Sequence, residues 1–290
     1  MLVLCYGIPK SGSTLGFELV RGVLMDAGYP QDPLSGPNLM AKNFLYGTQG
    51  HPEAFEAAIR QLLETIGPDR KVAVKTHEAA PVALFPWLEA LQTEGQLQVI
   101  ASYRDPRDIC LSLLDAGARA RSKGRKPFST FKTLDQAARS TAKRIEQFRI
   151  WGALQNSLRL YYDTAAFAPD EAISAIESIL HLNCDHNAVK AHAFDRSPTQ
   201  MNKGIQHRYK SELTEEQQQA LAGLFSEFLA RVCEQRDEAW YAECRARLLE
   251  KSVTETPGEA SRDRRNARRD RQRGKRRQLR KKAAALTEPA

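Results

Sequence analysis

The arrangement of short apolar runs along the chain most constrains its fold. Four such runs, over residues 2–7, 71–75, 97–103 and 158–162, are rich in β-branched and other apolar residues. They lack the alternation of apolar and polar side chains that marks a half-exposed strand, which predicts strands buried on both faces. Because helical patterns lie between them, we expect an α/β protein with three layers, in which helices flank a central, mostly parallel sheet.

The helical patterns also set the limits of the folded domain. Apolar residues repeat at helical spacing after residues 15, 55 and 108 and across 133–151. A capping box formed by Thr214 and Gln217 opens a further helix to about Arg231, with another helix reaching about Leu249. We therefore predict one domain over residues 1–250, followed by a polar linker and tail over 251–290.

Positive charge is concentrated in this tail. The formal net charge of the chain is +8, but residues 262–282 alone carry 13 Lys and Arg against two acidic residues, a net of +11. Subtracting the tail leaves −3, so the rest of the chain is near neutral. The tail is nearly free of apolar residues before Leu279, which predicts disorder. Its cations suit a polyanion, although such tails are more often solvated appendages.

Cysteine usage and hydropathy argue against several classes of protein. Five scattered cysteines form no C-x-x-C pair and no zinc-ligand pattern with histidine, so neither a disulfide framework nor a structural zinc site is expected. No apolar run is long enough for a membrane span, and none has the flanks of a secretory signal. We therefore expect a cytoplasmic protein.

The segment after the first predicted strand has the chemistry of a phosphate-binding loop. It reads Gly-Ile-Pro-Lys-Ser-Gly-Ser-Thr over residues 7–14 and leads into a helix. This geometry directs backbone N–H groups and the positive end of the helix dipole toward an anion. The pattern is not that of a Walker A loop, because Ser13 occupies the position of the Walker lysine and the lysine comes earlier, at Lys10. A donor other than a nucleoside triphosphate is indicated.

Residues 9–15, Pro-Lys-Ser-Gly-Ser-Thr-Leu, resemble the 5′-phosphosulfate-binding loop of the sulfotransferases that use 3′-phosphoadenosine-5′-phosphosulfate (PAPS). The resemblance, to the cytosolic and bacterial type of sulfotransferase domain, extends over approximately residues 2–230. It implies a three-layer fold of the P-loop nucleoside triphosphatase type. It also implies that the donor is bound by the loop residues Lys10, Ser11, Gly12, Ser13 and Thr14.

Two further segments resemble family motifs at the ends of later strands, where open α/β sheets bind their ligands. The segment Lys75-Thr76-His77 resembles one in which the histidine is the general base, and Glu78 directly after it is a rival base. Arg104 and Ser112 resemble the pair that holds the 3′-phosphate of the donor. A guanidinium group suits that role because its planar donors match a phosphate.

Two weaker matches complete the expected donor site. Residues 202–210, Asn-Lys-Gly-Ile-Gln-His-Arg-Tyr-Lys, resemble the loop that closes over the nucleotide, with Lys203 and Gly204 as expected ligands. This loop departs from the family pattern, because Asn202 replaces an arginine and a His-Arg pair at 207–208 replaces Gly-Asp. Tyr162 resembles a tyrosine that holds the adenine.

The resemblance implies in-line displacement at sulfur without a metal. An acceptor hydroxyl or amine attacks while His77 takes its proton, and adenosine 3′,5′-bisphosphate (PAP) leaves. Lys10 would balance charge on the leaving phosphate, and Lys75 would stabilise the transferring sulfuryl oxygens. Ser112, as both a phosphate ligand and a catalytic residue, would hold Lys10 away from the sulfate until the acceptor binds.

The acceptor and the oligomeric state are not specified by the sequence. We expect an acceptor pocket built from the loops over residues 29–50 and 116–133, which carry several aromatic residues. Basic residues between 119 and 126 would favour an acidic acceptor, unless they form an exposed, solvated loop. Two alternative functions stay open: a P-loop kinase that uses ATP and Mg²⁺, and a polyanion-binding protein that acts through the tail over 262–282.

Overall fold

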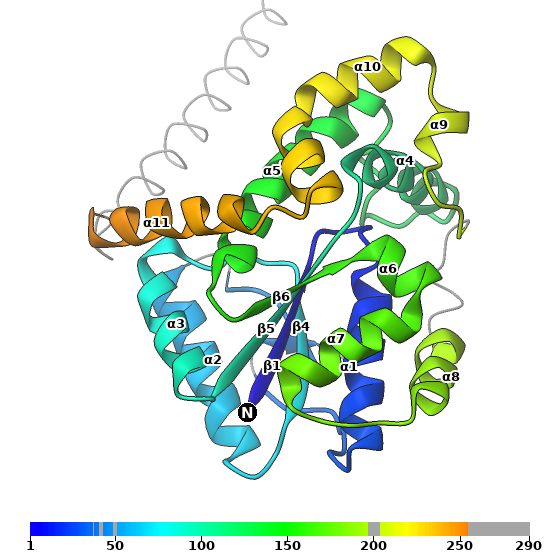
Figure 1. Ribbon diagram of the computed structural model, residues 1–290. Helices are drawn as coiled ribbons and strands as arrows, with labels where there is room; N and C mark the ends of the chain where they lie inside the picture. Colours follow the sequence, from blue (N-terminus) through cyan, green and yellow to red (C-terminus); the bar gives the residue numbers. More distant parts are fainter. Residues whose placement is uncertain (37, 41–42, 49–50, 197–203, 255–290) are drawn as a thin grey trace, which may run out of the picture.

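The computed structural model describes residues 1–36, 38–40, 43–48, 51–196 and 204–254. A six-stranded sheet forms the middle layer, in the order β2-β3-β4-β1-β5-β6 (Figure 1). The strands are β1 (Leu2–Gly7), β2 (Leu39–Met40), β3 (Phe44–Leu45), β4 (Val72–Thr76), β5 (Leu97–Tyr103) and β6 (Ser157–Tyr161). All neighbours are parallel except β2 and β3. The predicted three-layer α/β class is confirmed.

Helices cover both faces of the sheet. One layer contains α1 (Ser13–Asp26), α6 (Tyr162–Phe167), α7 (Pro169–Leu180) and α8 (His186–Arg196). The other contains α2 (Pro52–Ile66), α3 (Phe85–Thr93), α5 (Leu134–Ala153) and α11 (Glu238–Thr254), with η1 (Val82–Leu84). Beside α5 lies α4 (Pro106–Ser122), which in turn contacts α9 (Tyr209–Glu212) and α10 (Glu215–Leu224); the π-helix η2 (Phe228–Glu234) follows α10.

The central strand β1 explains why the apolar runs show no alternation. Leu2, Leu4 and Tyr6 belong to the larger hydrophobic core, which packs against α2, α3 and α5. Val3 and Cys5 point the other way, into a second core shared with α1, α7 and α8. Because successive side chains of a strand face opposite sides, a strand between two cores must be apolar at every position.

Several elements differ from the expectations. β2 and β3 lie within the predicted loop over 29–50, and two-residue strands carry no periodicity that could reveal them. The helix opened by Thr214 ends at Leu224 and is followed by a π-helix rather than continuing to 231. α11 runs to Thr254, slightly past the predicted domain limit. The tail over 262–282 lies outside the described residues.

The register of the sheet brings the motif-bearing loops together. Tyr6 pairs with Thr76, Gly7 with Ser102, and Tyr103 with Tyr161. The carboxyl ends of β1, β4, β5 and β6 therefore lie at one edge of the sheet, which is where ligands bind in open α/β folds.

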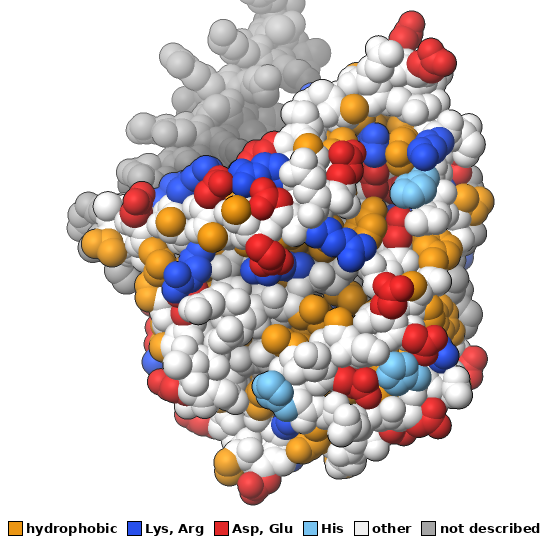
Figure 2. Space-filling model, in the orientation of Figure 1, with side chains coloured by type: hydrophobic (Ala, Val, Ile, Leu, Met, Phe, Trp, Pro, Cys, Tyr) orange, Lys and Arg blue, Asp and Glu red, His pale blue; other side chains and the backbone are white. Residues whose placement is uncertain are grey.

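The surface of the described part carries mixed charge. Over α11, basic and acidic side chains are interspersed rather than gathered into one patch of a single sign (Figure 2). Arg231 pairs with Glu243, and Arg245 pairs with Glu89. Within the described residues, no helix combines the length and apolarity that crossing a bilayer requires.

Candidate active site

The loop after β1 is shaped by two glycines. Gly12 precedes α1 in the left-handed region at φ 80°, and a Cβ atom there would lie 2.2 Å from the ring of Tyr162. A Cβ atom on Gly7 would lie 2.1 Å from that of Ser13. No side chain caps the start of α1. The loop, the helix start and the tyrosine ring can therefore approach closely, and an anion can take the place of the cap.

Lys10 projects from this loop in a left-handed backbone conformation, at φ 74°. Its Nζ lies 5.9 Å from the ring centroid of Phe128, which also has a positive φ. Burial, and then the positive charge of Arg119, lower the pKa of Lys10. A partly desolvated ammonium group is a good partner for an incoming anion, because the anion relieves the electrostatic cost of burial.

The end of β4 places two predicted residues beside this loop. The Nζ of Lys75 donates a hydrogen bond of 2.7 Å to the Oγ1 of Thr14. His77 follows directly after the strand, and its Nδ1 lies 2.6 Å from the carbonyl oxygen of Gly7. Because a carbonyl only accepts, Nδ1 carries the proton, and Nε2 keeps a lone pair that can accept one.

The electrostatic surroundings keep this histidine neutral. Burial of the ring, and then the positive charge of Lys75, lower the pKa of His77 to about 3. Arg144 and Lys10 act in the same direction. A bound anion would offset these cations and raise the pKa, so the ring becomes a stronger base when an anionic donor is present.

Glu78, the rival base, is held by the neighbouring loop. Its carboxylate accepts hydrogen bonds from the backbone N–H of Gly47 at 2.9 Å and of Thr48 at 3.1 Å, and from the Thr48 hydroxyl. Two side chains of α5 hold the backbone here, because Arg144 donates a hydrogen bond to the carbonyl of His77 and Trp151 donates one to the carbonyl of Glu78. Glu78 thus anchors the loop that follows β3.

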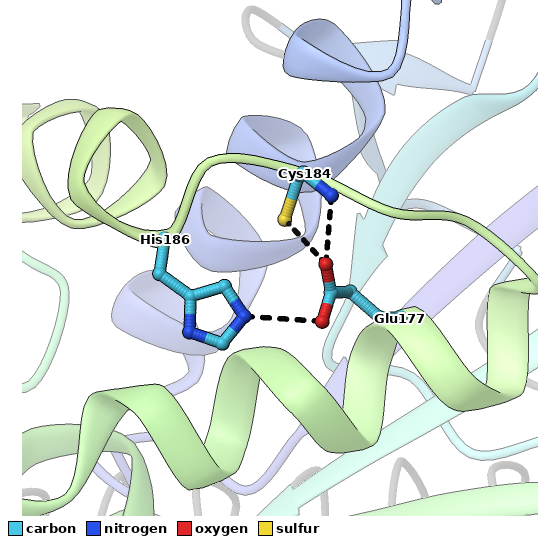
Figure 3. Close-up of side chains that lie close together, drawn as sticks. All are labelled: Glu177, Cys184 and His186. Atoms are coloured by element: carbon cyan, nitrogen blue, oxygen red, sulfur yellow. Dashed lines mark hydrogen bonds and ion pairs between the residues drawn. The ribbon is translucent and has the colours of Figure 1, made fainter.

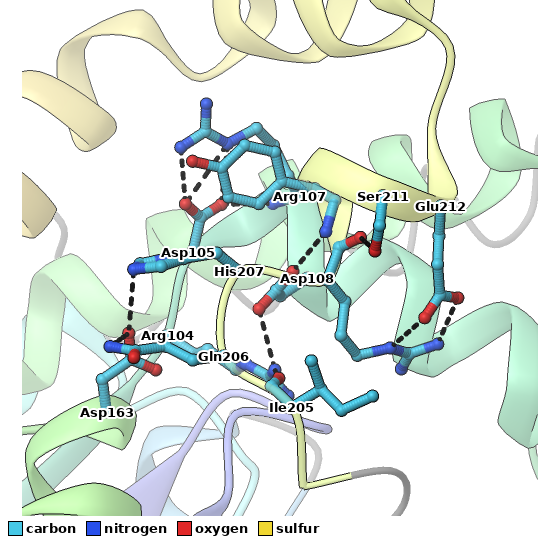
Figure 4. A network of polar contacts seen from close by, with 12 residues as sticks. Arg104, Asp105, Arg107, Asp108, Asp163, Ile205, Gln206, His207, Ser211 and Glu212 are labelled. Carbon is cyan, nitrogen blue, oxygen red and sulfur yellow. Dashed lines mark hydrogen bonds and ion pairs between the residues drawn. The ribbon is translucent and has the colours of Figure 1, made fainter.

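The third motif forms a buried polar network at the end of β5 (Figure 4). Arg104 is only 5% exposed and donates to Asp108 at 2.8 Å and to the carbonyl of Ile205 at 3.3 Å. Its guanidinium carbon lies 4.1 Å from the ring centroid of Tyr162. Asp108 also accepts from the backbone N–H of Tyr209. The network ties the start of α4 to the segment over residues 204–209.

The same segment is joined to α6 from the other side. Gln206 donates to the Asp163 carboxylate at 3.0 Å, and His207 lies 3.9 Å from it. Gly204 lines the cavity described below. Lys203, the other ligand expected from this loop, and Asn202 lie outside the described residues.

Arg208 lines the cavity described below, although the sequence marked it only as a departure from the family pattern. Its side chain is 1% exposed, donates to Glu212 and Asp115, and leaves Nη1 without a partner among the described atoms. The Nε of Arg104 is likewise unpartnered. Two buried guanidinium groups with unsatisfied donors beside one cavity form a receptor for an anion, because an unpaired buried N–H is costly.

These elements surround one cavity of about 360 Å³. It brings together nearly all the predicted site residues: Lys10, Gly12, Ser13, Thr14, Lys75, His77, Arg104, Ser112, Tyr162 and Gly204. Phe44, Phe128 and Arg208 also line it. Ser11 does not, because its buried hydroxyl bonds the carbonyl of Ser102 and its N–H bonds that of Ile8.

The structure is similar to solved structures of two proteins. One is mouse sulfotransferase SULT7A1 complexed with PAP, with a TM-score of 0.51 and 13% identity over 84% of this chain and 88% of that chain. Another is retinol dehydratase in complex with androsterone and PAP, with a TM-score of 0.46 and 14% identity over 79% of this chain and 80% of that one. No family model and no curated protein matches the sequence.

The chain has the sulfotransferase fold. The fold that the sequence resemblance implied is thus confirmed by the mouse sulfotransferase, although sequence identity to it is low. In this sulfotransferase fold, Tyr162 is the first residue of α6 rather than the last of a strand. Its ring lies against Gly12 and Arg104 and forms one wall of the cavity.

A second cluster of ligand-type side chains lies away from this cavity, where α7 meets α8 (Figure 3). Ligand atoms of Glu177, Cys184 and His186 lie within 4.8 Å of one another. Glu177 accepts from both the thiol and the backbone N–H of Cys184. The two ring nitrogens of His186 face Glu177 and Asp170, and these hydrogen bonds raise its pKa. A charged imidazole between two carboxylates satisfies all these groups and joins the helices.

Proposed function

We propose that this protein is a sulfotransferase that moves a sulfuryl group from PAPS to an acceptor hydroxyl or amine. The proposal rests mainly on one observation: residues of the four motifs line the same cavity. In it, a loop at a helix start lies beside two lysines, two buried arginines and a neutral histidine. The part of the cavity formed by the loop at the helix start and the two lysines suits the 5′-phosphosulfate. Arg104 and Arg208, with Ser112, suit the 3′-phosphate.

The geometry supports a direct displacement at sulfur. The acceptor oxygen bonds to sulfur while the bond from sulfur to the bridging phosphate oxygen breaks, so that PAP leaves. The acceptor proton goes to the Nε2 of His77, whose Nδ1–H is held by Gly7. His77 is favoured over Glu78 as the base, because the carboxylate of Glu78 accepts hydrogen bonds from the loop that follows β3.

Cations take up the charge that develops in this step. Lys10 lines the cavity beside the loop and would neutralise the leaving phosphate, while Lys75, held by Thr14, would stabilise the sulfuryl oxygens. Fixed charges of this kind are often the largest contribution to catalysis, because they need no reorganisation during the reaction. Ser112, which is buried at the cavity wall, would position Lys10 before the acceptor binds.

The composition of the cavity disfavours a kinase that uses ATP and Mg²⁺. None of the described residues that line it is aspartate or glutamate. Kinases and P-loop nucleoside triphosphatases hold their Mg²⁺ with carboxylates, assisted by hydroxyl or amide oxygens. We therefore expect the reaction to need no metal, with the charge balanced by the protein cations. A cytoplasmic location and a polyanion contact through residues 262–282 stay predictions.

The experiment is transfer of labelled sulfur from PAPS, measured in EDTA with a set of hydroxyl and amine compounds. We expect a labelled product that forms in step with PAP and that is lost in Lys10→Met. Transfer of labelled phosphate from ATP, dependent on magnesium, would contradict the proposal and favour the kinase.

A further inference from the structure

A second, larger cavity opens beside the cavity that is proposed to bind PAPS, here called the donor cavity. Its volume is about 770 Å³, and it shares Pro9, Phe44, His77 and Phe128 with the first. The other residues that line it are Tyr46, Glu78, Ala79, Pro127, Lys143, Arg144 and Gln147. The ring of His77 thus lies at the boundary between the two cavities, where an acceptor in the second could give its proton to the base.

Aromatic rings form the apolar part of the second cavity. Phe44 stacks on Tyr46 with ring centroids 6.2 Å apart and meets His77 edge-on at 5.4 Å. Tyr46 is 58% exposed and Phe128 is 38% exposed, so both keep apolar surface open. Phe44, Tyr46 and Phe128 come from the two loops expected to build the acceptor pocket. Such walls favour a flat or aromatic ring, because aromatic pairs gain from stacked and edge-on contacts.

The cations of this cavity come from α5, not from the basic loop over residues 119–126. Arg144 donates through Nη1 to the carbonyl of His77 at 3.0 Å and to Gln147 at 2.8 Å. No carboxylate of the described residues forms a salt bridge with Lys143 or Arg144. By contrast, Arg139 and Arg149 on the same helix pair with Asp135 and Glu227.

Among the described residues of the cavity wall, Glu78 is the one that is acidic, and the balance of charge is positive. Glu78 is held by the N–H groups of Gly47 and Thr48, and two cations stand beside it. Under the proposed function, the cations of the donor cavity would bind the phosphates and sulfate of the donor. The pair on α5 is therefore available to an anionic group of the acceptor.

On the basis of the proposed function, we propose that the acceptor is a hydroxylated aromatic compound that carries an anionic group. Its ring lies against Phe44 and Phe128, its hydroxyl faces the Nε2 of His77, and its anion lies at Lys143 and Arg144. The hydroxyl oxygen bonds to sulfur, its proton passes to His77, and PAP leaves. Carboxylate and phosphate share the chemistry that these cations recognise, so both belong to the test.

The test compares matched phenols on the full-length protein saturated with PAP, by calorimetry. The set is 3-(4-hydroxyphenyl)propionate, its neutral amide, the cation tyramine and a phenol with a phosphonate in place of the carboxylate. Charge-assisted hydrogen bonds are about twice as strong as neutral ones. We therefore expect whichever of the carboxylate and the phosphonate binds more tightly to bind about tenfold more tightly than the amide. Initial rates of sulfation should follow the same order.

Lys143 is the residue to substitute, because a change at Arg144 would also remove the hydrogen bond that holds the backbone of His77. We expect Lys143→Met to reduce the preference for the anion several-fold and Lys143→Glu to abolish it, while affinity for the amide is unchanged. Arg139→Met on the same helix is the matched control, since Arg139 pairs with Asp135 and does not line the cavity. The relative effect on carboxylate and phosphonate tells which anion the site prefers.

Equal or tighter binding of the amide would overturn the inference, as would a preference for the anion that survives Lys143→Glu. The same holds if PAP binds and none of the four phenols does. In each of these cases the donor site stands and only the acceptor class is wrong. If PAP itself fails to bind, the proposed function and this inference fall together.

Discussion

The two cavities that meet at His77 are built in different ways. The donor cavity is formed by strand ends in register, a left-handed glycine at a helix start and two arginines that are at most 5% exposed. The second cavity, which we propose binds the acceptor, is formed by side chains from four segments that follow or include strand and helix ends and from α5, with aromatic rings open to solvent. Backbone geometry fixes the first, and side-chain choice fixes the second. Residues of the donor cavity should therefore tolerate substitution far less.

The largest effect is expected at the boundary of the two cavities. His77→Ala removes the proton acceptor, and general-base catalysis contributes about 10² to 10⁴ in rate. Turnover in a sulfur-transfer assay should fall by that factor, while PAP affinity, measured by calorimetry, is nearly retained. Glu78→Ala is the companion variant. A fully active His77→Ala with an inactive Glu78→Ala would reverse the assignment of the base.

Within the donor cavity, Arg104→Ala should weaken PAP binding by about a hundredfold, because it removes a buried charge from the phosphate and leaves Asp108 unpaired. The loss should be much smaller for adenosine 5′-monophosphate (AMP), which lacks the 3′-phosphate. Thermal unfolding separates this effect from general damage to the Asp108 network. An equal loss for both nucleotides would mean that Arg104 acts only through folding.

The low pKa of His77 predicts a dependence of stability on pH. The unfolded chain takes up a proton at this residue below about pH 6.5, whereas the folded protein does so only near pH 3. Stability should therefore fall as the pH is lowered from 7 to 5. The decrease is about 1 to 2 kcal/mol after allowing for solvent around a half-buried ring. Urea unfolding of the wild type and of His77→Asn measures it. Identical slopes in the two proteins would contradict the assigned neutral ring.

Arg208 tests whether the departure from the family motif is functional. Arg208→Lys keeps the charge beside Asp115 and Glu212 but loses the planar donor that has no partner. We expect about tenfold weaker binding of PAP and little change for AMP. Arg149→Lys, in an ion pair with Glu227 outside both cavities, is the control. Unchanged PAP affinity in Arg208→Lys would limit Arg208 to a structural role.

The smallest effect is expected from the basic tail. Deletion of residues 261–290 should leave PAP affinity and turnover of a small acceptor unchanged, because every residue assigned to either cavity precedes it. Calorimetry and the transfer assay measure both quantities. Loss of activity on a small acceptor would show that the division between a catalytic domain and an appendage is wrong.

The contrast between the cavities also explains what the sequence could predict. The four long strands and the loop over 7–14 were predictable, because double-sided burial and a glycine-rich helix start leave local patterns. Arg208 was harder to assign, since its role depends on contacts with Asp115 and Glu212. Lys143 and Arg144 look in sequence like any charged residues of a helix. Only the packing of α5 against the residues that follow β4 places them beside His77.

The most direct test of the account is titration of the full-length protein with PAP by calorimetry in EDTA, with AMP and ATP as comparisons. We predict tight binding that requires the 3′-phosphate and needs no metal. Failure to bind PAP, or a preference for ATP with magnesium, would contradict the assignment of the donor cavity.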